Sequence, residues 1–373
     1  MSRRQSITAA AVLATLSSVA AAQSNVTIFG LIDANAGRFQ GPATGANALD
    51  KPVYKADSGG MSTSFWGLRG SEDLGGGLSA SFELASFIRS DTGAVGRADA
   101  IPAPVNVAAD TYWSRAAWVA LGSSTLGRVR LGNVTSLMFF NSITSNAFGD
   151  STVFSPLNLV TFIGSPLSGG TGWTNSVVYD SPNLSGVTVS AARSLAETQG
   201  GHNTGLRAAY SAGPFAASFA WQDVKKNPLT FADGTSANNT TSWQLGGSYD
   251  FSLVKVFAHL GRIQNDGTEA TPLNLSYRIW EISASLPVGA GQVLAGYAQR
   301  KTSDAVGPVP ATVAGGNIER SILTVGYDHY LSKRTDLYAM LMNDKTRTNS
   351  LPAPPTVVRA SATSYAVGIR HRF

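Results

Sequence analysis

Apolar and polar residues alternate in many short segments of this chain, and this alternation constrains the fold more than any other feature of the sequence. In 78–84, with the sequence LSASFEL, every second residue is apolar and the residues between are serine or glutamate. Segments 243–250 and 254–261 show the same period of two. Because successive side chains of a β-strand point to opposite faces, the pattern predicts strands with one apolar and one polar face. No amphipathic helix longer than a turn or two stands out, so the chain is predicted to be all-β.

About 16 strands can be delimited in this way, and the connections between them alternate in length. The predicted strands span 26–37, 61–72, 77–90, 111–122, 126–134, 173–181, 185–195, 203–212, 214–224, 240–250, 253–264, 276–285, 291–301, 319–330, 334–344 and 361–373. Short connections such as 123–125 and 331–333 alternate with long ones such as 38–60 and 135–172. An even strand number, with tight turns at one end and long loops at the other, is typical of a closed outer-membrane barrel.

A soluble β-sandwich and a membrane barrel place the apolar face of such strands differently. In a sandwich this face points into the core, whereas in a barrel it points to lipid and the polar face lines water. Alternation alone leaves both open, but a sandwich gives no reason for its connections to be sorted by length. Charged residues make up only 14% of the chain, below the roughly 25% of soluble domains. We therefore predict a 16-stranded antiparallel transmembrane β-barrel with short periplasmic turns and long extracellular loops.

The N-terminus indicates export. Arg3 and Arg4 precede an apolar run over 7–19, and Ala20–Ala22 supplies the small residues that a signal peptidase recognises. The run is shorter than the about 20 apolar residues that a membrane-spanning helix needs. We therefore predict a cleaved signal peptide at 1–22 and a single barrel domain at 23–373. A twin-arginine signal is the minor alternative, because a barrel has to reach the outer membrane unfolded.

The C-terminus continues the alternation to the last residue. From Tyr365 to Phe373 every second side chain is apolar, aromatic or histidine, and the chain ends on an aromatic ring, which is favoured at a bilayer interface. An open sheet edge in lipid would leave backbone groups unpaired. The last strand is therefore predicted to pair with the first.

Charge and motifs disfavour other functions. Removing the two arginines of the predicted signal peptide leaves 26 basic against 23 acidic residues, a net charge of 26 − 23 = +3, which is too small to indicate nucleic-acid binding. The chain has no cysteine for a thiolate metal site and no G-x-S-x-G, H-E-x-x-H or P-loop motif. An adhesion protein that uses the barrel only as an anchor remains an alternative, although about 16 strands leave an aqueous channel.

Several motifs, found in the same order along the chain, resemble the Gram-negative general porins, particularly their betaproteobacterial branch. They are VTIFGLIDA at 26–34, GLRGSEDLGGGL at 67–78, VYDSPN at 178–183, LSKRTDLY at 331–338 and the closing GIRHRF at 368–373. The resemblance implies a homotrimer in the outer-membrane lipid, without a cofactor, that admits small hydrophilic solutes and ions by passive diffusion. It also implies that the third extracellular loop folds inward and that its acidic residues face a basic row on the wall.

The same resemblance assigns residues to the constriction. The third loop is 135–172, where Asp150 is the candidate for the acidic side, although it can also be read as a solvated loop aspartate. Arg69 lies on the face that the family turns inward. Phe65, Ser79 and Asn133 stand where the family usually carries basic residues, and this loss predicts a weaker transverse field and weak charge selectivity.

Other charged residues fall on the predicted lumen face of their strands. They are Asp33, Glu83, Arg207, Lys255 and Glu281. Each can be a wall charge that keeps the lumen wet or a group that selects ions, and the sequence leaves both readings open. Arg38 and Arg115 lie near strand ends, where either the rim or the lumen is open to them.

Overall fold

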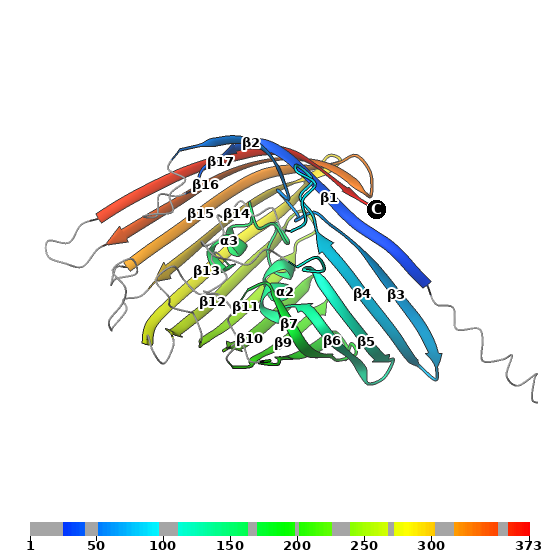
Figure 1. Cartoon of the computed structure of the whole chain (residues 1–373). Helices are drawn as coiled ribbons and strands as arrows, with labels where there is room; N and C mark the ends of the chain where they lie inside the picture. Colours follow the sequence, from blue (N-terminus) through cyan, green and yellow to red (C-terminus); the bar gives the residue numbers. More distant parts are fainter. Residues whose placement is uncertain are drawn as a thin grey trace, which may run out of the picture.

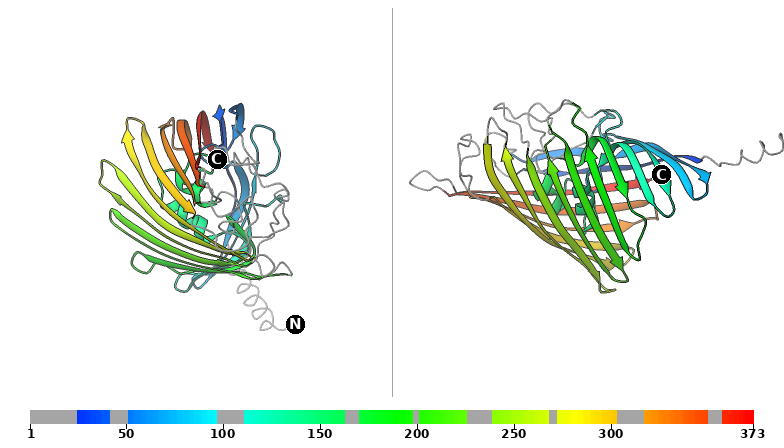
Figure 2. Two further views of the ribbon diagram at one scale, coloured as in Figure 1. Left: turned by 90° about the vertical axis from the view of Figure 1, so that its left-hand side faces the viewer. Right: turned by 90° about the horizontal axis from the view of Figure 1, so that it is seen from below.

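The computed structural model describes residues 25–41, 51–96, 111–162, 170–197, 201–225, 239–267, 272–302, 317–349 and 357–373. These residues form one antiparallel sheet that closes on itself as a barrel (Figures 1 and 2). The predicted signal peptide at 1–22 lies outside this part of the chain. Within the described ranges, no helix is both long and apolar enough to cross a membrane.

The strands follow the predicted order closely. They are β1 (Asn25–Phe39), β2 (Val53–Ser58), β3 (Phe65–Gly75), β4 (Leu78–Phe87), β5 (Ala116–Ser123), β6 (Gly127–Thr135), β7 (Gly172–Asp180), β8 (Val187–Ser194), β9 (Asn203–Ala212), β10 (Phe215–Val224), β11 (Thr240–Asp250), β12 (Lys255–Gly267), β13 (Pro272–Val288), β14 (Gly291–Thr302), β15 (Asn317–Tyr330), β16 (Thr335–Asn349) and β17 (Val357–Arg372). The main surprise among the strands is β2, which falls inside the connection predicted at 38–60.

β2 and β3 together fill one place in the barrel. β3 pairs with the first half of β1, from Asn25 to Leu31, and β2 pairs with the second half, from Ala34 to Phe39. Between them, residues 59–64 leave the sheet, so β3 begins at Phe65 rather than at the predicted position 61. The seventeen strands therefore occupy the 16 positions that the sequence predicts.

The barrel closes between its first and last strands, which confirms the predicted pairing. β1 and β17 are antiparallel, with Asp33 opposite Arg370. The backbone N–H of Gly30 donates to the carbonyl oxygen of Phe373 at 3.1 Å, and the N–H of Phe373 donates back to Gly30 at 3.1 Å. No edge is left between these two strands, which a bilayer would otherwise penalise.

The outer surface of the barrel carries the apolar faces of the strands. Val119 of β5 is 55% exposed and Val367 of β17 is 62% exposed, although both are large apolar residues in regular strands. In water such a surface would be unfavourable, whereas in a bilayer it is the expected lipid-facing band. Ser81 and Glu83, which alternate with the apolar residues of β4, face the interior of the barrel, called the lumen below.

The third long connection folds into the lumen, and its residues 136–162 are called the inner loop (Figure 1). Where the sequence shows no obvious secondary structure, the loop contains two short helices, α2 (Leu137–Thr144) and α3 (Pro156–Phe162). The Ser136 hydroxyl caps α2 by accepting from the N–H of Phe139 at 3.3 Å, and Pro156 starts α3 at the position where proline is favoured.

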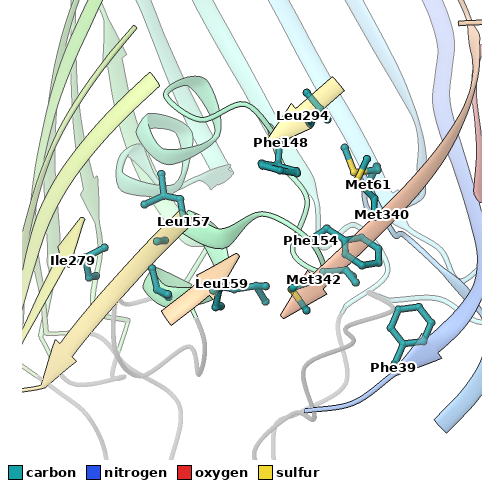
Figure 3. Packing of buried hydrophobic residues seen from close by; sticks show 14 of the residues in the cluster. Phe39, Met61, Phe148, Phe154, Leu157, Leu159, Ile279, Leu294, Met340 and Met342 are labelled. Carbon is teal, nitrogen blue, oxygen red and sulfur yellow. The ribbon is translucent and has the colours of Figure 1, made fainter. Parts of the chain in front are cut away.

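The helices of the inner loop pack against the wall between β8 and β15. α2 contacts β8 to β11, and α3 contacts β13 to β15. Phe154 and Leu157 are fully buried, and they belong to a cluster that includes Ile279 of β13 and Met340 of β16 (Figure 3). The main apolar core among the described residues therefore lies inside the lumen, between the loop and the wall formed by β12 to β17.

Candidate functional site

A cavity of about 540 Å³ opens in the lumen on the side that the inner loop leaves free. It is bounded by β1, β3 to β8 and the first helix of the loop. Its charged lining residues are Arg69, Glu83, Arg115, Arg128, Arg130 and Asp180. The four arginines among them are called the arginine wall below. Because charged residues line this cavity and it lies beside the loop, it is the candidate passage for solutes.

Arg128 and Arg130 reach the cavity because β6 alternates regularly. Val129 and Leu131 of the same strand are exposed on the outside, and Arg128 and Arg130 alternate with them. The two arginines therefore point inward. Nε of Arg130 donates to Oδ2 of Asp180 at 2.9 Å, and Nη2 of Arg128 donates to the same oxygen at 3.1 Å. One carboxylate thus holds two guanidinium groups at the wall.

Arg115 lies immediately before β5, where the sequence left rim and lumen open, and the structure places it in the lumen. Its Nη1 lies 3.4 Å from Oε1 of Glu83. Its guanidinium also stacks over the ring of Phe65, with 3.8 Å between Cζ and the ring centroid. Arg69 is directly opposite Glu83 in the β3–β4 register and lies 4.8 Å above the ring of Phe29.

The sequence analysis missed Arg128, Arg130 and Asp180. A signal was available, since the R-V-R pattern at 128–130 alternates in phase with the apolar residues that face lipid. The expectation of a weak field rested on the absence of basic residues at Phe65, Ser79 and Asn133 and of an acidic residue at Ala147, but other positions on this side of the wall supply basic side chains. At Phe65, the guanidinium of Arg115 occupies the space above the ring.

Ser79 and Asn133 lie away from the cavity. Ser79 faces inward but lies opposite Asp73, close to the short β3–β4 turn. Asn133 lies two residues after the outward-facing Leu131, on the same face of β6. Its amide donates to the carbonyl oxygens of Trp113 at 3.1 Å and Ser114 at 3.0 Å. The Asn133 side chain therefore holds the segment before β5 rather than lining the passage.

Asp150 joins the inner loop to residues 59–64, the segment between β2 and β3. Its Oδ1 accepts a hydrogen bond from the hydroxyl of Ser62 at 2.9 Å. The backbone N–H groups of Met61 and Ser62 both donate to Oδ2 of Asp33 at 2.8 Å. The hydroxyl of Tyr338 donates to the other oxygen of Asp33 at 2.6 Å.

Two of the predicted lumen charges point inward but do not meet water. Asp33 is fully buried among the contacts just described, and Glu281 of β13 is 2% exposed beneath the inner loop. The prediction that they line a wet lumen is therefore wrong. The physical reason is that the loop covers this side of the wall, which strand alternation cannot reveal.

Arg207 and Lys255 lie at two different levels of the lumen. Arg207 of β9 is nearly buried, donates to the hydroxyl of Thr144 at 3.3 Å and lies 4.7 Å from the ring centroid of Phe140. It therefore holds α2 against the wall. Lys255 lies at the start of β12, opposite Asp250 and close to the short β11–β12 turn. It therefore lies at the short-turn end of the lumen.

Buried ion pairs hold the covered side together. Arg370 donates through Nε to Asp336 at 2.7 Å and through Nη2 to Asp328 at 2.8 Å. Arg320 donates through Nε to Oδ1 of Asp344 at 3.0 Å. These pairs are nine-tenths or more buried and are well compensated, as buried charges need to be.

Arginine side chains also fix the end of α3. Arg300 of β14 donates to the carbonyl oxygen of Val160 at 3.1 Å, and Arg320 of β15 donates to that of Leu159 at 3.4 Å. The last carbonyls of a helix lack partners within the helix and carry partial negative charge, so cations are favoured there. The covered side of the wall thus positions the loop that shapes the passage.

Comparisons with known proteins agree with this architecture. The sequence pattern of the Gram-negative porins matches residues 9–349. An outer-membrane porin of Bordetella pertussis is 28% identical over 99% of this chain and all of its own length. Outer membrane porin protein 32 of Delftia acidovorans is 31% identical, with the same coverage. The solved structure of an anion-selective porin from Comamonas acidovorans is 25% identical, has a TM-score of 0.72, and is matched over 94% of this chain and all of its own.

The pattern covers most of the chain, and the relatives align from end to end. The closed barrel, its apolar exterior and the open cavity lined by charged residues are the features that such a channel requires. The chain therefore belongs to the Gram-negative porin family, and it is an outer-membrane channel for passive diffusion rather than an enzyme.

Proposed function

We propose that this porin favours anions and that they pass along the arginine wall. The observation that carries the proposal is the charge balance of the cavity lining, where four arginines face two carboxylates, a balance of 4 − 2 = +2. Both carboxylates are already engaged in ion pairs with these arginines. A cleft lined by an excess of one sign raises the local concentration of the opposite ion.

The constriction is proposed to lie between the arginine wall and the inner loop. Arg69, Arg115 and Arg130 form its basic side, and Glu83 and Asp150 are the acidic groups that moderate the field. Arg115 interacts electrostatically with both Glu83 and Asp150. A similar solved porin is described as anion-selective, which supports the sign of the proposed preference. The weak selectivity expected from the missing basic residues stays a prediction.

Three further assignments complete the proposal. Residues 1–22 are a signal peptide that is removed on export, residues 23–373 are the mature barrel, and the mature protein assembles as a homotrimer in outer-membrane lipid. The solutes are small and hydrophilic, because the lining combines charged groups with serine and threonine hydroxyls such as those of Thr27, Ser81 and Ser190. No cofactor or energy source is needed for diffusion.

The reversal potential in a KCl gradient tests the proposed ion preference. The wild-type protein reconstituted in a planar bilayer should give the sign of an anion-preferring channel. R130S should shift the potential toward cations, because it removes one cation and leaves Asp180 less compensated. R193S is the matched control, since Arg193 is exposed on the outer face of β8. A wild-type potential on the cation side, or equal shifts in the two variants, would refute the proposal.

A further inference from the structure

A row of basic residues crosses the outer surface of the barrel at one level. In the strand registers, each member lies directly opposite the next on the neighbouring strand. The members, in order from β12 to β17, are Arg262, Arg278, Lys301, Glu319, Arg347 and Arg359. This row is called the basic belt below. It contains five basic residues and one acidic residue, a balance of 5 − 1 = +4.

The basic belt faces outward and lies just above the apolar band. Arg262 is two residues from Leu260 along β12, and Arg278 is two residues from Trp280 along β13, so each pair shares a face of its strand. Leu260 is 53% exposed and belongs to the lipid-facing surface. The belt lies on the side of this band away from the short turns, which is the extracellular side of an outer-membrane barrel.

The belt is poorly compensated within the protein. Arg278 has Arg262 directly opposite on one side and Lys301 directly opposite on the other. Like charges in directly opposed positions destabilise a sheet. The carboxylate of the belt, Glu319, lies 3.7 Å from the ammonium group of Lys301, and it also accepts from Gln299 at 2.8 Å. Most of the positive charge therefore faces the surroundings, where an anionic layer would stabilise it.

We propose that the basic belt binds the phosphate groups of a phosphorylated, acylated glycolipid in the outer leaflet. The guanidinium groups of Arg278 and Arg359 can each engage phosphate oxygens through two parallel hydrogen bonds, whereas Arg262, which already donates to Ser276 and Gln264, contributes its charge. The acyl chains of the same lipid would lie along the apolar band below, beside Leu260. A lipid offers both contacts at once, whereas a free phosphate ion offers only the first. This inference is independent of the proposed anion preference, because the belt is outside the lumen.

Binding of bisphosphorylated lipid A to the purified protein in uncharged detergent tests the inference. R278Q removes the charge between Arg262 and Lys301 and keeps a polar side chain, and R193Q is the control on the outer face of β8. A basic residue near an anionic surface contributes about 1 kcal/mol, so R278Q should bind about fivefold more weakly than the wild type. R193Q should bind as the wild type does. Dephosphorylated lipid A should not distinguish the three proteins.

Thermal unfolding gives a second readout, in which the order of wild type and R278Q should differ between samples without and with lipid A. Without lipid A, R278Q should unfold at a higher temperature than the wild type, because a like-charge contact is relieved. With bisphosphorylated lipid A, the wild type should gain more than R278Q, since a ligand that binds the folded state stabilises it. This reversal separates a binding role for Arg278 from a purely structural one, which would lower stability in both conditions.

Four results would overturn the inference. They are equal affinity of R278Q and the wild type for bisphosphorylated lipid A, equal binding of the dephosphorylated lipid, equal stabilisation by inorganic phosphate alone, or an altered oligomeric state of R278Q with unchanged lipid binding. The third result would indicate a simple ion site. The fourth would assign the belt to contacts between copies of the chain.

Discussion

Two parts of the lumen wall share the same alternating pattern but have different environments. On the half formed by β3 to β8, inward-facing charges such as Arg69 and Arg130 border an open cavity. On the half formed by β12 to β17, inward-facing charges are buried, Arg320 against the end of α3 and Arg370 beside Ser62. Both halves alternate polar inward residues with apolar outward ones. Alternation therefore determines which way a side chain faces, and loop packing determines whether it meets water.

This difference dictates how charges are arranged. On the covered half, each buried arginine has a carboxylate or a helix carbonyl as partner, because an unpaired buried charge is costly. On the open half, water screens the charges, so an excess of arginine is tolerated. The covered half thus holds the loop in place, and the open half is where we propose that the ion preference arises. Three substitution pairs test this division.

The largest effect is expected from R370A on the covered half. The substitution leaves Asp328 and Asp336 buried without their main partner, which should lower the free energy of unfolding by about 3–5 kcal/mol. R69A on the open half should change it by about 1 kcal/mol or less, because exposed charges contribute little. Equilibrium unfolding by urea in lipid vesicles measures both. Equal losses in the two variants would remove the distinction between a covered and an open half.

A smaller effect on the free energy of unfolding is expected where a charge is introduced on the lipid-facing surface. V119K places an ammonium group on the outward face of β5 and should cost roughly 2–4 kcal/mol near the middle of the bilayer. S81K places the same group in the open cavity, where it should leave stability nearly unchanged and increase the preference for anions. The same unfolding assay and the reversal potential report the two effects. If S81K destabilised as much as V119K, the cavity would not be wet.

The smallest effect is expected from D150N. The substitution removes a negative charge near Arg115 and keeps an oxygen that can accept from Ser62, so the inner loop should stay in place. The reversal potential should move slightly toward anions, by less than the opposite shift of R130S. D266N, on the outer face of β12, is the control. An unchanged potential would exclude Asp150 from the constriction.

The order of the strands, the closure of the barrel and the inward or outward direction of the side chains could be predicted because they depend on local patterns. The alternation around Ser81 and Val119 is read directly from the chain, and the pairing of β1 with β17 follows from the need to close the sheet. The inward R-V-R motif of β6 follows the same local alternation, whereas the positions that the resemblance implies, Phe65, Ser79 and Asn133, carry no basic side chain.

The covered half could not be predicted in the same way. Glu281 and Arg320 look like any other inward-facing charges, and their burial depends on a loop more than a hundred residues away in sequence. The break between β2 and β3 at residues 59–64 also depends on contacts that are distant in sequence. It rests on Asp33, whose carboxylate accepts from the backbone of Met61 and Ser62, and no local propensity signals such a contact.

Cysteine accessibility tests the central claim most directly, because the chain has no cysteine of its own. Ser81 lines the open cavity, and Thr324 of β15 faces inward but is fully buried under the loop. A charged, water-soluble thiol reagent added during current recording should react rapidly with S81C and reduce the conductance, and it should leave T324C unmodified. Equal modification of both cysteines, or none at S81C, would contradict the account.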